Sequence, residues 1–197
     1  GWRARPNLDC RCLDAQAQAF HAVTDPHGWP GRRGLEESRL VVIGDSHAFG
    51  YGVDHAAAFF AVRPELRVKA IGAPGYNLVQ ELLLMERLAP RLAGKLVVWL
   101  VYLGNDLHES LTPEMNGYRT PFVRRAAGGT WEIVQEHVSP ATWKASDHVR
   151  SQNWYATLAA LHSESFLAER AYSACAFLLE AGAQLGRRAG FTLTVAT

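Results

Sequence analysis

The chain has 197 residues, of which 48% are hydrophobic and 20% charged, and its formal net charge at pH 7 is +1. This length suits one globular domain, and the near-zero charge excludes the basic surface typical of proteins that bind nucleic acids. No run of residues is long and apolar enough to predict a membrane span. We therefore expect neither a nucleic-acid partner nor a membrane span, and the sequence does not indicate an oligomeric state.

Residues 1–38 are polar and rich in turn-forming residues, and they predict an N-terminal arm that packs on the domain and includes a short hairpin. Cys10 and Cys12 would lie on the same face of a strand. A zinc site that adds His21 and His27 is conceivable, but the spacing matches no common zinc motif. We favour free thiols and expect no metal.

Residues 39–197 predict one α/β domain, because apolar strand patterns alternate with helical ones. The pattern over 66–71 alternates apolar and charged side chains, which predicts a half-exposed strand, whereas 96–103 is apolar throughout and predicts a central strand. The predicted strands are 39–43, 66–71, 96–103 and 191–196, and the predicted helices are 56–60, 77–89 and 154–188, the last as one helix or two.

Helix boundaries follow from capping and breaking residues. Asp54 is a candidate N-cap for the first helix, which Pro64 would end, and Pro90 would close the second. Residues 107–150 interrupt the alternation and predict a β-hairpin-like insertion above the sheet.

The resulting fold is a doubly wound parallel sheet with helices on both faces, flavodoxin-like in type. Right-handed crossovers place the carboxyl ends of the strands at one edge, so the turns after the first three strands should meet there. The chain ends on strand 191–196 without a helix to cover it, and we therefore expect the domain to be incomplete at its C-terminus.

Three motifs follow those strands in order: Gly-Asp-Ser at 44–46, Gly-Ala-Pro-Gly-Tyr-Asn at 72–77 and Leu-Gly-Asn-Asp at 103–106. Together they resemble the SGNH (GDSL-type) serine hydrolases. The resemblance covers about residues 39–106 and implies three catalytic positions. Ser46 would be the nucleophile, while the backbone N–H of Gly75 and the side-chain amide of Asn105 would stabilise the oxyanion.

A serine needs an imidazole base, and the family supplies it from a C-terminal Asp-x-x-His motif. This sequence contains no Asp-x-x-His, and we expect that motif beyond residue 197. Among the histidines present, His108 is the better substitute and His47 a poorer one. Asp45 and Asp106 are interpreted as residues that brace turns, because carboxylates near an oxyanion would oppose the reaction.

The resemblance implies an esterase that acts on a small-molecule or glycan-linked ester through an acyl-enzyme, with no cofactor. Two alternatives remain open: a carbohydrate O-acetyltransferase and a catalytically inactive binding domain. A platform for a sugar or acyl group could be built from the aromatic residues Trp131, Trp143, Trp154 and Tyr155. The chain carries no recognisable targeting segment, and we favour the bacterial periplasm or secretion.

Overall fold

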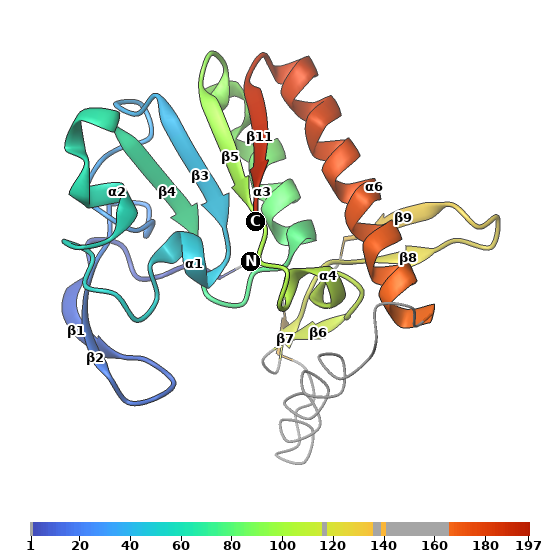
Figure 1. The fold of residues 1–197 in the computed structure, drawn as a ribbon, viewed down its shortest axis with the longest axis horizontal. Coiled ribbons are helices and arrows are strands. Elements are labelled where there is room, and N and C mark those ends of the chain that lie inside the picture. Colours follow the sequence, from blue (N-terminus) through green and yellow to red (C-terminus); the bar gives the residue numbers. More distant parts are fainter. Residues whose placement is uncertain (1, 116–117, 136–138, 141–165) are drawn as a thin grey trace.

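The structure is a computed structural model that describes residues 2–115, 118–135, 139–140 and 166–197 (Figure 1). Its centre is a four-stranded sheet of β3 (Leu40–Gly44), β4 (Val68–Gly72), β5 (Leu96–Leu100) and β11 (Thr192–Ala196). All four strands are parallel, in the order β11-β5-β3-β4. The predicted α/β class and parallel sheet are confirmed, and the strand order is compatible with a flavodoxin-like fold.

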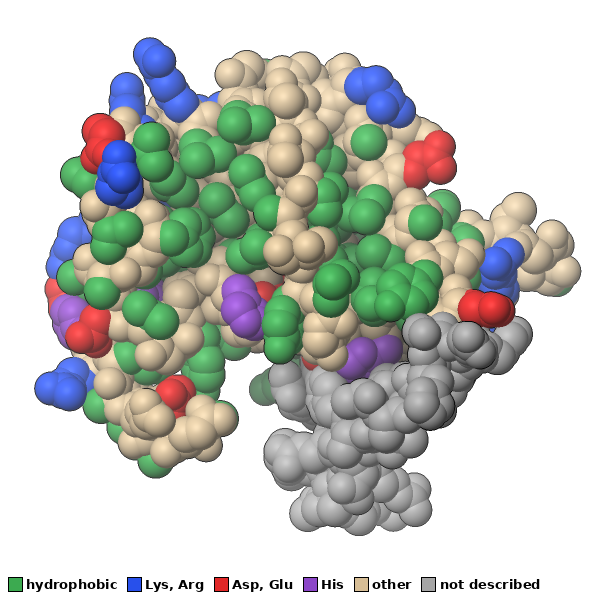
Figure 2. Space-filling view, in the orientation of Figure 1, with side chains coloured by type: hydrophobic (Ala, Val, Ile, Leu, Met, Phe, Trp, Pro, Cys, Tyr) green, Lys and Arg blue, Asp and Glu red, His purple; other side chains and the backbone are tan. Residues whose placement is uncertain are grey.

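Helices flank both faces of the sheet. One face packs on α3 (Leu78–Leu92) and α6 (Phe166–Ala189), and the other carries α1 (Ser46–Phe49) and α2 (Phe59–Val62). Val41 and Ile43 of β3 belong to the first core and Val42 to the second, because successive side chains of a strand point to opposite faces. The second face is covered only in part, and Figure 2 shows hydrophobic side chains gathered over the front of the sheet.

The first helix differs from its prediction. Asp54 does not cap it, because Asp54 Oδ1 accepts a hydrogen bond from the backbone N–H of His21 in the N-terminal arm, and α2 begins only at Phe59. The helix ends before Pro64, as predicted, and Pro64 starts the short 3₁₀ helix η1 (Pro64–Leu66). A contact that is distant in sequence therefore replaces the local cap.

The prediction that β4 is half-exposed was wrong, because all five of its residues are buried. Lys69 is only 1% exposed, and its Nζ lies 2.9 Å from Asp25 Oδ2 of the N-terminal arm. The same Nζ donates a hydrogen bond to the carbonyl of Pro30 (3.1 Å). The charge of Lys69, which suggested a solvent-facing side of the strand, is therefore paired with a carboxylate inside the protein.

Helix α3 begins as the sequence predicts and ends later. Asn77 and Gln80 form a capping box at its start. Pro90, expected to close the helix, lies inside its last turns, and the helix continues to Leu92. A proline this close to the end of a helix removes one backbone hydrogen bond without disrupting the turns that pack on the sheet.

The N-terminal arm contains the predicted short hairpin, formed by β1 (Asp9–Leu13) and β2 (Ala19–Val23). Phe20 and Ala22 of this hairpin pack on Phe49 of α1, and Trp29 and Leu35 reach the main core. The arm therefore shares buried surface with the sheet and its helices.

The insertion contains the predicted hairpin as β8 (Phe122–Arg125) and β9 (Trp131–Val134), in register from Phe122 with Val134 to Arg125 with Trp131. Its other elements are α4 (Asp106–Glu109), β6 (Glu114–Met115), β7 (Tyr118–Arg119) and β10 (Ser139–Pro140). The Trp131 indole donates to Ser173 Oγ of α6 (3.0 Å), so it holds the hairpin on that helix. The platform candidates Trp143, Trp154 and Tyr155 lie outside the described residues.

The last predicted helix and strand are present as α6 and β11, with residues 141–165 outside the described part of the chain. Within the described ranges, no helix is long and apolar enough to cross a membrane.

Candidate active site

Ser46 is the first residue of α1 and follows β3 after a sharp turn. The turn is held by Asp45, whose Oδ1 accepts a hydrogen bond from the backbone N–H of His47 (2.8 Å). Close packing requires glycine before it, because a Cβ at Gly44 would lie 2.9 Å from the carbonyl oxygen of Leu100. The half-buried Ser46 is therefore fixed at the carboxyl end of β3.

Gly75 lies in the turn that joins β4 to α3. Its φ of +78° is a left-handed conformation that favours glycine, which agrees with the residue found there. The turn is held from outside by Trp2 of the arm, whose indole donates to the carbonyl of Pro74 (2.8 Å). The turn is also fixed at its end by Asn77, the N-cap of α3.

Asn105 lies between β5 and α4, at the N-cap position of this one-turn helix. Its side chain makes no capping hydrogen bond, and its buried Oδ1 has no hydrogen-bond partner among the described residues. The neighbouring Asp106 holds the turn, since its Oδ2 accepts from the backbone N–H of Tyr102 (2.7 Å). The side chain of Asn105 is thus not used to cap α4.

Sheet register brings these three turns to the same edge. Gly44 pairs with Gly72, and Ile43 pairs with Trp99, so β3, β4 and β5 end at nearly the same level. Figure 1 shows their arrowheads pointing toward α1 and α4. The strand order reverses between β3 and β5, where ligands bind in open α/β sheets. Ser46 and Asn105 follow these two strands.

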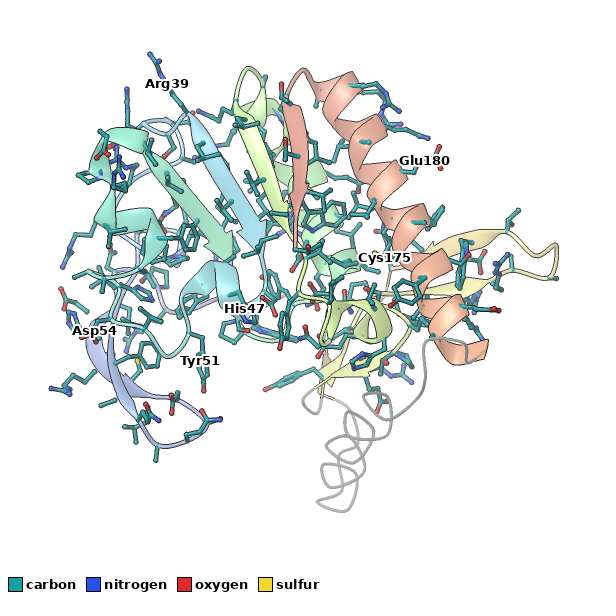
Figure 3. All side chains as sticks on the ribbon, in the orientation of Figure 1. Arg39, His47, Tyr51, Asp54, Cys175 and Glu180 are labelled. Atoms are coloured by element: carbon teal, nitrogen blue, oxygen red, sulfur yellow. The ribbon has the colours of Figure 1, made fainter. Side chains whose placement is uncertain are left out.

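The hydroxyl of Ser46 faces a carboxylate. Ser46 Oγ donates to Asp45 Oδ2 (3.2 Å), while His47 Nδ1 lies 3.2 Å from Asp45 Oδ1. Asp45 therefore bridges the serine and the histidine, and no hydrogen bond between Ser46 and an imidazole occurs among the described residues. Figure 3 shows His47 on α1, below the end of β3.

His108 is buried in α4, and burial lowers its pKa to about 4, so its imidazole is neutral at pH 7. Two other described histidines have roles elsewhere: His21 pairs with Asp9, and His55 Nδ1 lies 2.8 Å from the carbonyl of Val23. Three more, His137, His148 and His162, lie outside the described residues.

Four buried carboxyl groups lie beneath the strand edge, and the sequence analysis did not identify them as a group: Asp45, Glu81, Asp106 and Glu109. Glu81 Oε2 accepts from the indole N–H of Trp99 (2.6 Å). Burial raises the pKa of Glu81 well above its usual value, and the charge of Asp106 adds to this effect. Glu81 lies between Leu78 and Leu82 on the apolar face of α3, which is the one sequence signal that could have revealed it.

Burial also raises the pKa of Asp106 to about 8, and the charge of Asp45 adds to this effect. Its Oδ1 has no hydrogen-bond partner among the described residues. The interpretation of Asp45 and Asp106 as turn-bracing residues is confirmed by their bonds to the backbone N–H groups of His47 and Tyr102. At neutral pH, the buried group therefore holds at least one carboxyl in its protonated form.

Replacing Asp106 with asparagine is expected to stabilise the protein at high pH. The folded state binds a proton at Asp106 up to about pH 8, whereas the unfolded chain releases it near pH 4, so stability falls as pH rises between these values. Asparagine keeps an acceptor for Tyr102 N–H and carries no charge. In urea titrations at pH 8.5 we expect a gain of at least about 1 kcal/mol, and little gain at pH 4.5.

The matched control is Asp14→Asn, which changes a surface carboxylate that accepts from the backbone N–H of Gln16 (2.9 Å). This variant should show no comparable gain at pH 8.5. Equal stability of Asp106→Asn and the parent protein at both pH values would contradict the assignment of a protonated Asp106.

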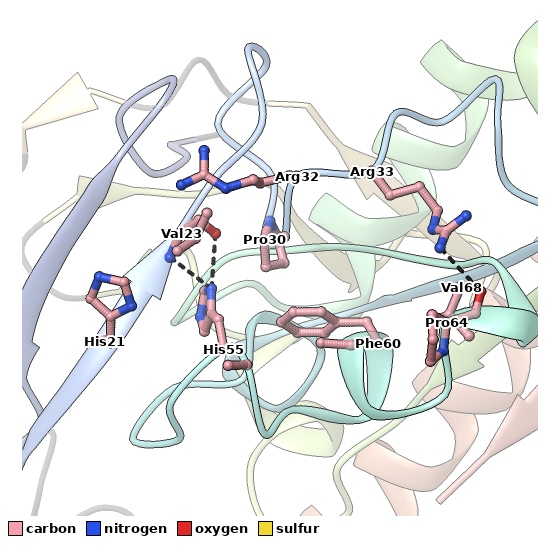
Figure 4. Close-up of a pocket in the computed structure, with 12 residues that line it drawn as sticks. His21, Val23, Pro30, Arg32, Arg33, His55, Phe60, Pro64 and Val68 are labelled. Atoms are coloured by element: carbon pink, nitrogen blue, oxygen red, sulfur yellow. Dashed lines mark hydrogen bonds between the residues drawn. The ribbon is translucent and has the colours of Figure 1, made fainter.

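A separate pocket of about 420 Å³ lies on the β4 side of the molecule, between the N-terminal arm and α2 (Figure 4). Phe60, Pro64 and Val68 form part of its apolar lining, and Arg32 and Arg33 are at its rim. Arg33 donates to the carbonyl of Pro64 (3.1 Å), and Arg32 pairs with Asp9. Both guanidinium groups are thus already engaged within the protein.

The cysteines of β1 lie on one face, as the sequence predicts, with 3.6 Å between the Sγ atoms of Cys10 and Cys12. They are free thiols. His21, the nearest candidate for a zinc ligand, directs its Nε2 to Asp9 (2.8 Å). Over the described ranges, no group of three or more His, Cys, Asp or Glu side chains is arranged to hold a metal ion.

No protein-family model and no curated protein matches this sequence.

Proposed function

We propose that the protein is a serine hydrolase of the SGNH type that cleaves a carboxylic ester through an acyl-enzyme on Ser46. The observation that carries this proposal is the convergence of three turns at the carboxyl edge of a parallel sheet. These turns present a hydroxyl, a glycine in a left-handed conformation and an asparagine amide that caps nothing. They are the three chemical parts that a nucleophile and an oxyanion hole require.

In this reaction the oxygen of Ser46 attacks the ester carbonyl, and the carbonyl oxygen becomes negatively charged. The backbone N–H of Gly75 and the side-chain amide of Asn105 would donate hydrogen bonds to that oxygen, and each such donor lowers the barrier by about 3–4 kcal/mol. The alcohol then leaves with a proton, and water releases the acid from Ser46.

The resting hydroxyl donates to Asp45, so it must rotate away before a base can remove its proton. An acyl-enzyme mechanism at neutral pH requires such a base, which the family takes from an Asp-x-x-His segment. This sequence contains no Asp-x-x-His, and no imidazole bonds to Ser46 among the described residues. Asp45 would remain bonded to the N–H of His47 and keep the turn intact while Ser46 reacts.

The second candidate is a binding domain without catalysis. The observation that favours it is the bond from Ser46 to a carboxylate instead of an imidazole among the described residues. The two candidates differ in one property, the nucleophilicity of Ser46. An O-acetyltransferase would share this nucleophile and would differ only in the acceptor of the acyl group.

A fluorophosphonate probe tests the proposal, because it forms a covalent bond only with an activated serine. After labelling of the protein, tryptic digestion yields a peptide of residues 40–67, in which Ser46 is the only serine. We expect mass spectrometry to find the probe on this peptide when the native protein is labelled, and not when the protein is heat-denatured before labelling. Absence of label on this peptide would favour the binding domain. A separate measurement, acetate release from a model ester with and without a glycan acceptor, distinguishes a hydrolase from a transferase.

A further inference from the structure

Tyr102 and His47 form an exposed aromatic pair beside the candidate nucleophile. Their ring centroids lie 4.2 Å apart with 35° between the ring planes. Tyr102 is 47% exposed, and the side chain of His47 is 51% exposed. His47 directly follows Ser46, and Tyr102 precedes Asn105 in the turn after β5. The pair therefore spans the two turns that would hold an ester.

Both rings are held in place although they face solvent. A Cβ on Gly104 would lie 2.7 Å from the Tyr102 ring, so this ring packs directly on the backbone of the turn. The backbone N–H of Tyr102 is bonded to Asp106, and His47 Nδ1 lies close to Asp45. An ordered ring loses little conformational entropy on binding, which makes it an efficient contact surface.

The pair offers two kinds of interaction. The face of an aromatic ring carries partial negative charge and attracts C–H groups, which carry slight positive charge. The phenol oxygen of Tyr102 and the Nε2 atom of His47 add hydrogen-bonding groups next to that face, whereas His47 Nδ1 already lies 3.2 Å from Asp45 Oδ1. A ligand that uses both has a flat C–H-rich surface edged with hydroxyls, as a pyranose ring does, whereas an alkyl chain would use neither hydrogen-bonding group.

We propose that Tyr102 and His47 are the binding platform for the sugar ring of an O-acylated carbohydrate, whose ester would lie over Ser46. This inference rests on the proposed hydrolase function for the placement of the ester. Of the four aromatic residues considered above for a platform, Trp131 is the one within the described ranges, and its indole is bonded to Ser173 of α6.

The test measures binding of methyl 6-O-acetyl-α-D-glucopyranoside by NMR titration in a Ser46→Ala background, in which the ester is not consumed. We expect Tyr102→Ala to weaken binding by about 3- to 10-fold, the range of a stacked aromatic contact. Tyr102→Phe should retain most of the affinity because it keeps the ring, and His47→Ala should weaken binding. Tyr172→Ala, which removes an exposed tyrosine of α6, is the matched control and should bind as the parent does.

The outcomes separate this inference from the proposed function. Binding that depends on Tyr102, together with a wild-type protein that no fluorophosphonate labels, would support the platform and overturn the hydrolase. Labelling of Ser46, together with equal affinity of Tyr102→Ala and its parent, would overturn the platform and keep the hydrolase. No detectable binding to the Ser46→Ala parent would also overturn the platform, and so would a Tyr102→Phe variant as weak as Tyr102→Ala.

Discussion

Replacing Ser46 with alanine is expected to lower the rate of ester hydrolysis by about 10⁴- to 10⁶-fold, the loss typical of a deleted serine nucleophile. The acyl-enzyme cannot form without the hydroxyl, whereas the donors on Gly75 and Asn105 would remain. The fold should be unaffected, because the variant loses only one long hydrogen bond, from Ser46 Oγ to Asp45 (3.2 Å). Initial rates with a model acetate ester and a thermal unfolding curve measure the two effects.

Ser110→Ala is the matched control for this variant. Ser110 is buried in the segment that follows the same strand edge, and its hydroxyl donates to the backbone carbonyl of Asp106 (2.9 Å). Its hydroxyl therefore has a structural role, and the variant should keep its turnover within about threefold of the wild type. If Ser46→Ala also retained turnover at that level, the nucleophile would have to be a different residue.

The positions of the three turns could be predicted from the sequence because the signal for each is local. A short run of β-branched or aliphatic residues followed by glycine predicts where a buried strand stops. Gly44 and Gly72 end their strands in register as expected. The central strand was placed correctly but predicted too long, since β5 ends at Leu100 and the exposed Tyr102 already belongs to the turn. The apolar ring of Tyr102 is therefore not a sign of burial in the sheet.

Errors arose where a residue's partner lies far away in the sequence. Asp54 has the chemistry of an N-cap, but the backbone of His21 provides a competing donor. Lys69 has the pattern of a surface residue, but Asp25 neutralises it inside the core. A local sequence pattern indicates which interactions a side chain can make. It does not identify a partner that is distant in the sequence and comes into contact only in the folded protein.

The carboxyl groups under the site were missed for a related reason. Asp45 and Asp106 were assigned to turns one at a time, and each does brace a turn. Only the packing of α3 against β5 brings Glu81 near them, through its bond to the Trp99 indole. The mutual repulsion that helps to raise the pKa of Asp106 is a property of the assembled group, which no single motif contains.

Replacing Lys69 with methionine is expected to reduce the free energy of unfolding by about 3–5 kcal/mol, the typical cost of removing one partner of a buried ion pair. Asp25 would lose its cationic partner in a site where both side chains are only 1% exposed. The loss should be measurable as a lower urea midpoint with an unchanged slope. It should also weaken the attachment of the N-terminal arm, whose Trp2 holds the turn of Gly75 through Pro74.

The double variant Lys69→Met with Asp25→Asn separates charge from packing. The introduced asparagine would keep the side-chain oxygen that accepts from the backbone N–H groups of His27 and Trp29, but it would carry no charge. If the cost of the single variant comes from an unpaired carboxylate, the double variant should be the more stable of the two, and Ser46 should be labelled more strongly in it than in Lys69→Met. A double variant no more stable than Lys69→Met would assign the loss to the packing of the lysine stem and to its bond with Pro30. Trp2 of the arm is bonded to Pro74 in the turn of Gly75. Labelling of Ser46 in the same two variants therefore shows whether the Lys69–Asp25 ion pair positions that turn as well as stabilising the fold.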